Sequence, residues 1–146
     1  ALYEPARMAR AAVDRNLEAL GQPTATAPAA AIARLVGAIA GWSANEPWAL
    51  LGPLHVVEGS RMGSMVLCRS LGRAFGLDPR RAGTGLDYHT DGLPARPKDW
   101  KQFCDGLAAL PLSDAEAAGV CSAATEAMDA LLDMYSAAAV EPAVAV

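Results

Sequence analysis

Apolar residues recur at helical spacing along most of the chain. The first such segment begins around Pro5 and ends at Gly21, because proline is tolerated in a first helical turn and glycine favours a helix end. A loop over residues 22–28 follows. The next segment, from Ala29 to Trp42, carries only one charge, Arg34, and is apolar on most sides. This pattern predicts a helix that is heavily buried.

Three more helices are expected in the rest of the chain. Between the first and second of them, residues 76–97 contain four glycines and three prolines, which predicts a loop of about 20 residues. Ser113 and Glu116 have the spacing of a capping box, in which each residue binds a backbone N–H of the other. The predicted helices run from Pro47 to about Phe75, from Lys98 to Leu110 and from Ser113 to about Ala139.

The composition points to the same fold class. The chain has 146 residues, of which 53% are hydrophobic and 5% aromatic. Alanine, the strongest helix former, is its commonest residue. We therefore predict an all-α fold, and the length fits a single helical domain over residues 1–146.

Two further observations bear on the compartment. The uncharged stretch from Leu35 to Asn45, like every other uncharged stretch of the sequence, is shorter than the roughly 20 residues that a membrane-spanning helix needs. The chain has no basic and apolar leader, and its three cysteines (Cys68, Cys104 and Cys121) cannot all pair with one another. These features predict free thiols and a cytoplasmic location.

Charge is distributed unevenly along the chain. The net charge is −4, yet the segment from Arg61 to Lys101 holds eight cations and only four anions. A basic segment in an acidic protein favours a small anionic ligand or an acidic protein partner over nucleic acid. A solvated charged face is the simpler alternative.

The longest predicted helix contains two glycines on one face. Gly59 and Gly63 are four residues apart, and Ser60 and Ser64 follow them. Each glycine inside a helix lowers helix stability by roughly 1 kcal/mol relative to alanine, so the presence of two glycines needs an explanation. A flat ligand lying directly on the backbone is one explanation. A kink, or a tight helix crossing through small residues, is another.

The same segment resembles the distal-helix motif of the bacterial biliverdin-producing heme oxygenases, Glu-Gly-Ser-x-Leu-Gly-Gly after an aliphatic run. The matching residues are Glu58, Gly59, Ser60, Met62 and Gly63, with Ser64 in place of the last glycine. A glycine-rich loop, the segment Trp100-Lys-Gln-Phe103 and an alanine-rich last helix follow in the family's order. The resemblance therefore covers most of the chain.

This resemblance implies a heme oxygenase-like bundle whose central helix is kinked at its glycines. Heme would be both cofactor and substrate, and it would be cleaved oxidatively to biliverdin, CO and ferrous iron. Gly59, Ser60 and Gly63 would form the catalytic face, and an acidic electron-donor protein would bind the basic surface. The residues expected to bind heme are Gly59, Gly63, Ser64, Arg61, Lys98 and Lys101, with Arg69 and Arg96 as further partners for the propionates.

The family's axial histidine lies on a helix N-terminal to the matched part, and we expect no counterpart of that region in this chain, whether because the chain is truncated, uses another ligand or has lost heme chemistry. Its two histidines are His55 and His89. His55 lies one turn before Gly59 and is our candidate axial ligand, with a core histidine as the simpler alternative. His89 stands between Asp87 and Asp91, where a hydrogen-bonded turn is favoured over a metal site.

Two other functions stay open. A shortened bundle without an axial ligand would be a catalytically inactive binding or assembly module. Its exposed apolar surface, with Trp42 and Trp48, would be covered by a partner chain or by a second copy in a homo-oligomer. Alternatively, His55 and Glu58, three residues apart on one helix, would bind metal in a non-heme iron helical-bundle oxidase.

Overall fold

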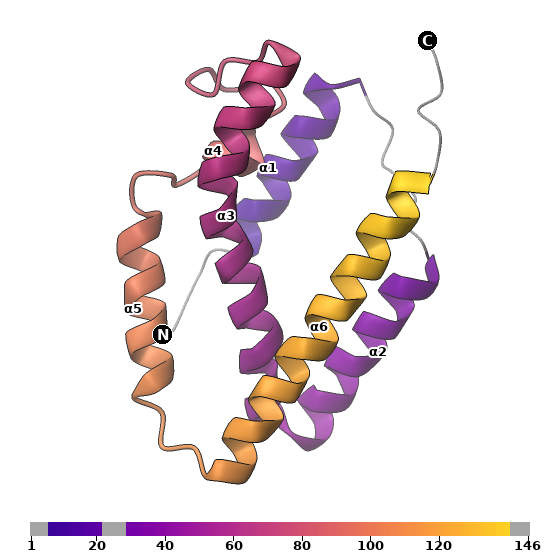
Figure 1. Ribbon diagram of the computed structural model, residues 1–146, viewed down its shortest axis with the longest axis vertical. Coiled ribbons are helices and arrows are strands. Elements are labelled where there is room, and N and C mark those ends of the chain that lie inside the picture. Colours follow the sequence, from indigo (N-terminus) through magenta and orange to yellow (C-terminus); the bar gives the residue numbers. More distant parts are fainter. Residues whose placement is uncertain (1–5, 22–28, 141–146) are drawn as a thin grey trace. The chain divides into compact units, whose positions relative to one another are not determined.

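The computed structural model describes residues 6–21 and 29–140, and these residues form helices and connecting segments without a strand. In chain order the elements are α1 (Ala6–Ala19), α2 (Ala29–Asn45), η1 (Pro47–Leu50), α3 (Leu51–Phe75), α4 (Asp87–Thr90), α5 (Arg96–Ala108) and α6 (Asp114–Val140), as Figure 1 shows. The all-α prediction is confirmed. The predicted helix start around Pro5 and the loop over residues 22–28 lie outside the described residues.

The helices form two compact units whose sequence ranges interleave. The first unit comprises Ala1–Ala25 and Gly59–Cys104, and the second comprises Thr26–Glu58 and Asp105–Val146. Both α3 and α5 contribute residues to each unit. A single domain over residues 1–146 stays a prediction, and so does a kink in α3, which is one continuous helix from Leu51 to Phe75.

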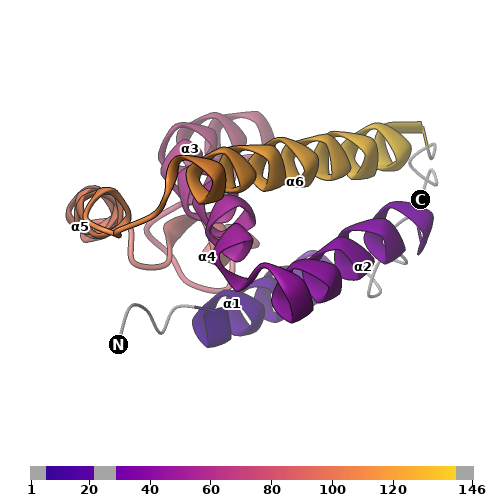
Figure 2. The same ribbon diagram turned by 90° about the horizontal axis from the view of Figure 1, so that it is seen from below.

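In the second unit α2, η1 and α6 pack against one another, and Figure 2 shows α2 and α6 side by side. The buried positions on η1 and α6 are mainly alanines. Such small side chains let helices approach closely, and a Cβ added to Gly52 would lie 2.6 Å from the backbone nitrogen of Ala124. The ring of Trp48 fills the space that a Cβ on Gly119 would need. Trp48 is therefore a packing residue, contrary to its predicted place on a partner surface.

The prediction that α2 is heavily buried is wrong. Val36 is 58% exposed and Ile39 is 38% exposed. Within its unit α2 packs against α6 and η1. Neighbours of this kind cover one face of a helix, so apolar residues on its other faces stay at the surface.

The start of α6 has the predicted capping box. The backbone N–H of Glu116 donates to the hydroxyl of Ser113 at 3.3 Å, and the backbone N–H of Ser113 donates to the carboxylate of Glu116 at 2.8 Å. The Ser113 hydroxyl and N–H bonds lower the pKa of Glu116. The prediction is confirmed, and these bonds satisfy donors that the first turn of α6 would otherwise leave unpaired.

The predicted loop between α3 and α5 contains a helical turn, α4, which packs against α1. The Asp87 carboxylate accepts hydrogen bonds from the backbone N–H of Gly83 and lies 3.5 Å from the guanidinium of Arg15. The backbone N–H of Asp87 donates to the side chain of Asn16 at 2.7 Å. Gly85 has a φ of 90°, which glycine adopts without strain. These bonds fix the segment, so Asp87 serves a hydrogen-bonded turn.

Candidate functional site

The two motif glycines of α3 have different surroundings. The indole of Trp100 on α5 lies 3.6 Å from the position of a Cβ on Gly59, which is ordinary van der Waals contact. Nothing in the described part of the chain lies within 4 Å of a Cβ added to Gly63. Along the helix from Gly63, Val66 is 71% exposed and Leu67 is also at the surface. Packing of the described residues therefore gives no reason for a glycine at position 63.

An aromatic pair on α5 borders this surface at Gly59. Trp100 and Phe103 are three residues apart, and their ring centroids lie 5.8 Å from each other at an interplanar angle of 27°. Stacking of this kind holds a large ring in one orientation. We call the surface formed by Gly59, Gly63, Val66 and Leu67 the glycine face.

Ser64 and His89 form a polar pair next to the glycine face. The Ser64 side chain is 3% exposed, and its hydroxyl lies 3.1 Å from Nδ1 of His89. Burial and, to a smaller extent, the charge of Arg96 lower the pKa of His89. The imidazole is therefore neutral near pH 7, and it shares a hydrogen bond with a hydroxyl group one residue after Gly63.

Arg96 has a structural role. Its buried guanidinium donates to the backbone carbonyls of Asp91, Arg61 and Tyr88 at distances from 2.6 to 3.1 Å. The prediction that Arg96 binds a propionate is wrong, because its donors are occupied by carbonyl groups. It instead ties α3 to the turn that carries His89.

The other predicted site residues are spread over α3 and α5. Ser60, Lys98 and Lys101 are exposed, and Arg61 is half-buried. His55 is exposed, and it lies with Glu58 in the part of α3 that belongs to the second unit. In the described residues no three His, Cys, Asp or Glu side chains are placed to hold a metal ion. Of the predicted site residues, the structure thus brings Ser64 together with His89.

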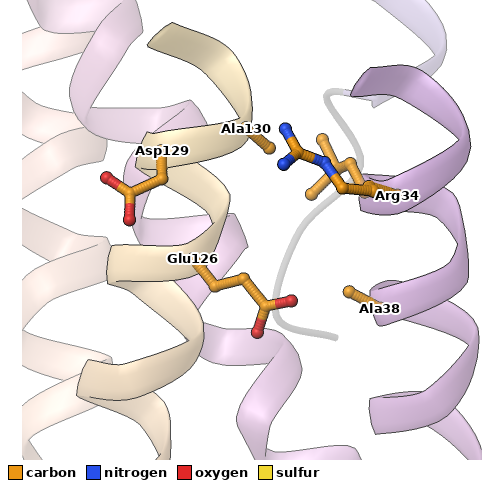
Figure 3. A pocket seen from close by; sticks show the side chains of 6 residues that line it. Arg34, Ala38, Glu126, Asp129 and Ala130 are labelled. Atoms are coloured by element: carbon orange, nitrogen blue, oxygen red, sulfur yellow. The ribbon is translucent and has the colours of Figure 1, made fainter. Parts of the chain in front are cut away.

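Two cavities stand out in the described part of the chain, and the larger one borders the glycine face at Val66. One of about 340 Å³ lies in the second unit between α2 and α6 (Figure 3). In it Arg34 points towards α6, where it forms an ion pair with Asp133, and Glu126 points towards α2. The other, of about 840 Å³, lies in the first unit beside the C-terminal half of α3. Sequence reasoning missed it, although Arg69 and Arg73 are spaced to share a helix face there.

The structure is that of an all-α protein in which the backbone of α3 is open to the surface at the glycine face. The chain belongs to the heme oxygenase family, whose model matches residues 1–137. No curated protein and no solved structure matches it. No helix in the described ranges is long and apolar enough to cross a membrane.

Proposed function

We propose that the chain binds heme on the glycine face and supports its oxidative cleavage to biliverdin, CO and ferrous iron. The open backbone at Gly63 supports the proposal most strongly. A glycine inside a helix costs roughly 1 kcal/mol relative to alanine, and no described neighbour requires one there. When bound, heme supplies both the redox-active iron and the ring that O₂ and reducing equivalents oxidise.

The residues around Gly63 suit an apolar planar ligand. The exposed Val66 and Leu67 side chains offer apolar contact area, and burying it stabilises a complex by roughly 25 cal/mol per Å². Trp100 borders the same surface at Gly59. A tight helix crossing, the alternative explanation, is found at Gly52 and not at Gly63.

Polar groups around the glycine face would serve orientation and proton supply. The hydroxyl of Ser60 is exposed beside Gly59, and the Ser64–His89 pair holds an exchangeable proton one residue from Gly63. Lys98 and Lys101 lie on α5, the helix that carries Trp100 to this surface, and with Arg61 they would pair with the propionate groups. His55 stays our candidate for the axial ligand.

The proposal extends to partners and location. The excess of cations between Arg61 and Lys101 favours an acidic electron-donor protein. We also expect a cytoplasmic protein, and a homo-oligomer or partner chain that covers apolar surface. Met128, Leu132 and Tyr135 supply such surface, since they are exposed and recur every four and three residues on α6.

That exposed row on α6 also favours a second candidate function, the catalytically inactive binding or assembly module. Such a module would form a stable oligomer and bind hemin weakly. The non-heme iron alternative lacks a third ligand beside His55 and Glu58 in the described residues.

Titration with hemin followed by ascorbate separates these functions. A heme oxygenase gives a saturable Soret band, which ascorbate and O₂ convert to the spectrum of biliverdin. Loss of the Soret band in a His55→Ala variant would identify His55 as the axial ligand. A wild-type chain that forms oligomers and gives no Soret band would contradict the proposed function and support the inactive module.

A further inference from the structure

The larger cavity is bounded by apolar side chains from two parts of the first unit. Met65 and Val66 come from α3, and Leu93 and Pro94 come from the segment after α4. Its volume of about 840 Å³ lies within the range of roughly 300–1,000 Å³ that is typical of small-molecule sites. An organic ligand with an apolar body would bury these walls, whereas an inorganic anion would leave them in contact with water.

Three guanidinium groups line the same cavity. Arg69 and Arg73 lie one turn apart on α3, and Arg80 comes from the segment between α3 and α4. The lining contains no aspartate or glutamate, and none of the three guanidinium groups forms an ion pair with a carboxylate of the described residues. The nearby Asp78 accepts a hydrogen bond from the backbone N–H of Arg80. The cavity therefore carries an excess of positive charge.

The cavity between α2 and α6 provides a contrast. Its only arginine, Arg34, is paired with Asp133, and Glu126 and Asp129 also line it. In that cavity the chain itself supplies the negative charge that faces the arginine. In the cavity beside α3, a ligand would have to supply the negative charge.

We propose that the cavity beside α3, which borders the glycine face at Val66, is a second ligand site for an amphipathic organic acid with two or more negative groups. Guanidinium groups bind carboxylates through paired, charge-assisted hydrogen bonds, and Arg69, Arg73 and Arg80 offer three such partners. Met65, Leu93 and Pro94 contact the apolar body of the ligand. Biliverdin, an open-chain tetrapyrrole with two propionates, has this chemistry, and its choice as the ligand rests on the proposed function.

Titration of the full chain with biliverdin, followed by absorbance and induced circular dichroism, tests the site. We expect saturable binding that becomes about tenfold weaker in Arg69→Gln and in Arg80→Gln, since each removes one charge-assisted contact. Arg81→Gln is the matched control, because Arg81 is the exposed neighbour of Arg80 and does not line the cavity. It should change the affinity less than about twofold.

Hemin titration of the same variants shows whether the site is separate. Unchanged hemin affinity in Arg80→Gln supports two sites, because Arg80 is not among the residues expected to bind heme. Arginine-dependent biliverdin binding by a chain that fails to bind hemin also supports the second site, although that result contradicts the proposed function. Parallel loss of both ligands would assign the arginines to the heme site and overturn the inference. The inference is also overturned if the wild-type chain does not bind biliverdin, or if Arg81→Gln weakens binding as much as Arg80→Gln.

Discussion

The two halves of α3 use glycine for opposite reasons. In the N-terminal half, Gly52 lies where α3 meets α6, and a Cβ there would be 2.6 Å from the backbone nitrogen of Ala124. In the C-terminal half, Gly63 meets no described atom within 4 Å of the same position. The first glycine permits a close helix crossing. The second leaves a bare backbone at the surface.

This difference teaches how to interpret glycines in a helix. A glycine required by packing can be replaced only at a cost to folding. A glycine on an open helix face lowers helix stability, so its replacement by alanine should stabilise the fold. A position where alanine improves stability and harms binding is one at which a ligand requires the glycine.

The largest expected effect on stability is at Gly52, the glycine that packs against α6. Gly52→Ala should lower the free energy of unfolding by roughly 3 kcal/mol, the upper end of overpacking costs, because its Cβ would meet backbone atoms that cannot rotate away. Urea denaturation followed by circular dichroism measures this. Gly37→Ala, at an open position of α2, is the matched control and should not destabilise the chain. Equal stability of the two variants would remove the contrast between the glycines.

Replacement of Gly63, the glycine with open space around it, should have opposite effects on stability and on hemin binding. Gly63→Ala should raise the free energy of unfolding by roughly 0.5–1 kcal/mol, because alanine is the better helix former and has space there. The same change should weaken hemin binding, since the new methyl group lifts a flat ligand off the backbone. Denaturation and hemin titration of one preparation measure both effects. A stabilised variant with unaltered hemin affinity would show that no ligand rests at this position.

A third substitution should destabilise only the N-terminal half of α3, where α6 packs against Gly52. Ser113→Ala should cost about 1 kcal/mol of stability, because it removes the capping bonds of α6, the helix that closes over Gly52. The bonds from Ser113 lower the pKa of Glu116, so their contribution is present above the ordinary pKa of 4.5 and is lost as the pH falls below it. Acid titration of stability should therefore be shallower in the variant. A drop in hemin affinity would contradict the separation of the two halves.

The smallest expected effect concerns His89, next to the glycine face, and the pH dependence of the free energy of unfolding. Burial and Arg96 lower the pKa of His89, so the unfolded chain binds a proton there more tightly than the folded chain does. The stability contributed by the neutral ring is present above the ordinary pKa of 6.5 and decreases as the pH falls towards the lowered value. His89→Gln should flatten this dependence in urea denaturation between pH 7.5 and 5. If the free energy of unfolding depends on pH equally in the variant and the wild-type chain, groups other than His89 cause that dependence.

Local signals in the sequence predict most of the fold. Helix starts and ends follow from proline, glycine and the Ser113–Glu116 capping box, because these act within a few residues. The motif around Gly59 indicates the family. Burial of α2 is misjudged, since composition alone cannot tell how many neighbours a helix has.

The details of the site depend on distant contacts. Arg96 binds the carbonyl of Arg61, 35 residues earlier, and His89 meets Ser64, 25 residues earlier. Neither pair has a spacing that a local pattern reveals. Gly52 and Gly63 are likewise indistinguishable in sequence, because their difference lies in what α6 places against one of them.

The most direct test is hemin titration of Gly63→Leu beside Gly37→Leu. Both changes add the same side chain at an open helical position, one on the glycine face of α3 and one on α2. The Soret band should saturate in Gly37→Leu as it does in the wild-type chain, and it should be lost or strongly weakened in Gly63→Leu. A Soret band of equal strength and affinity in both variants would contradict heme binding on the glycine face.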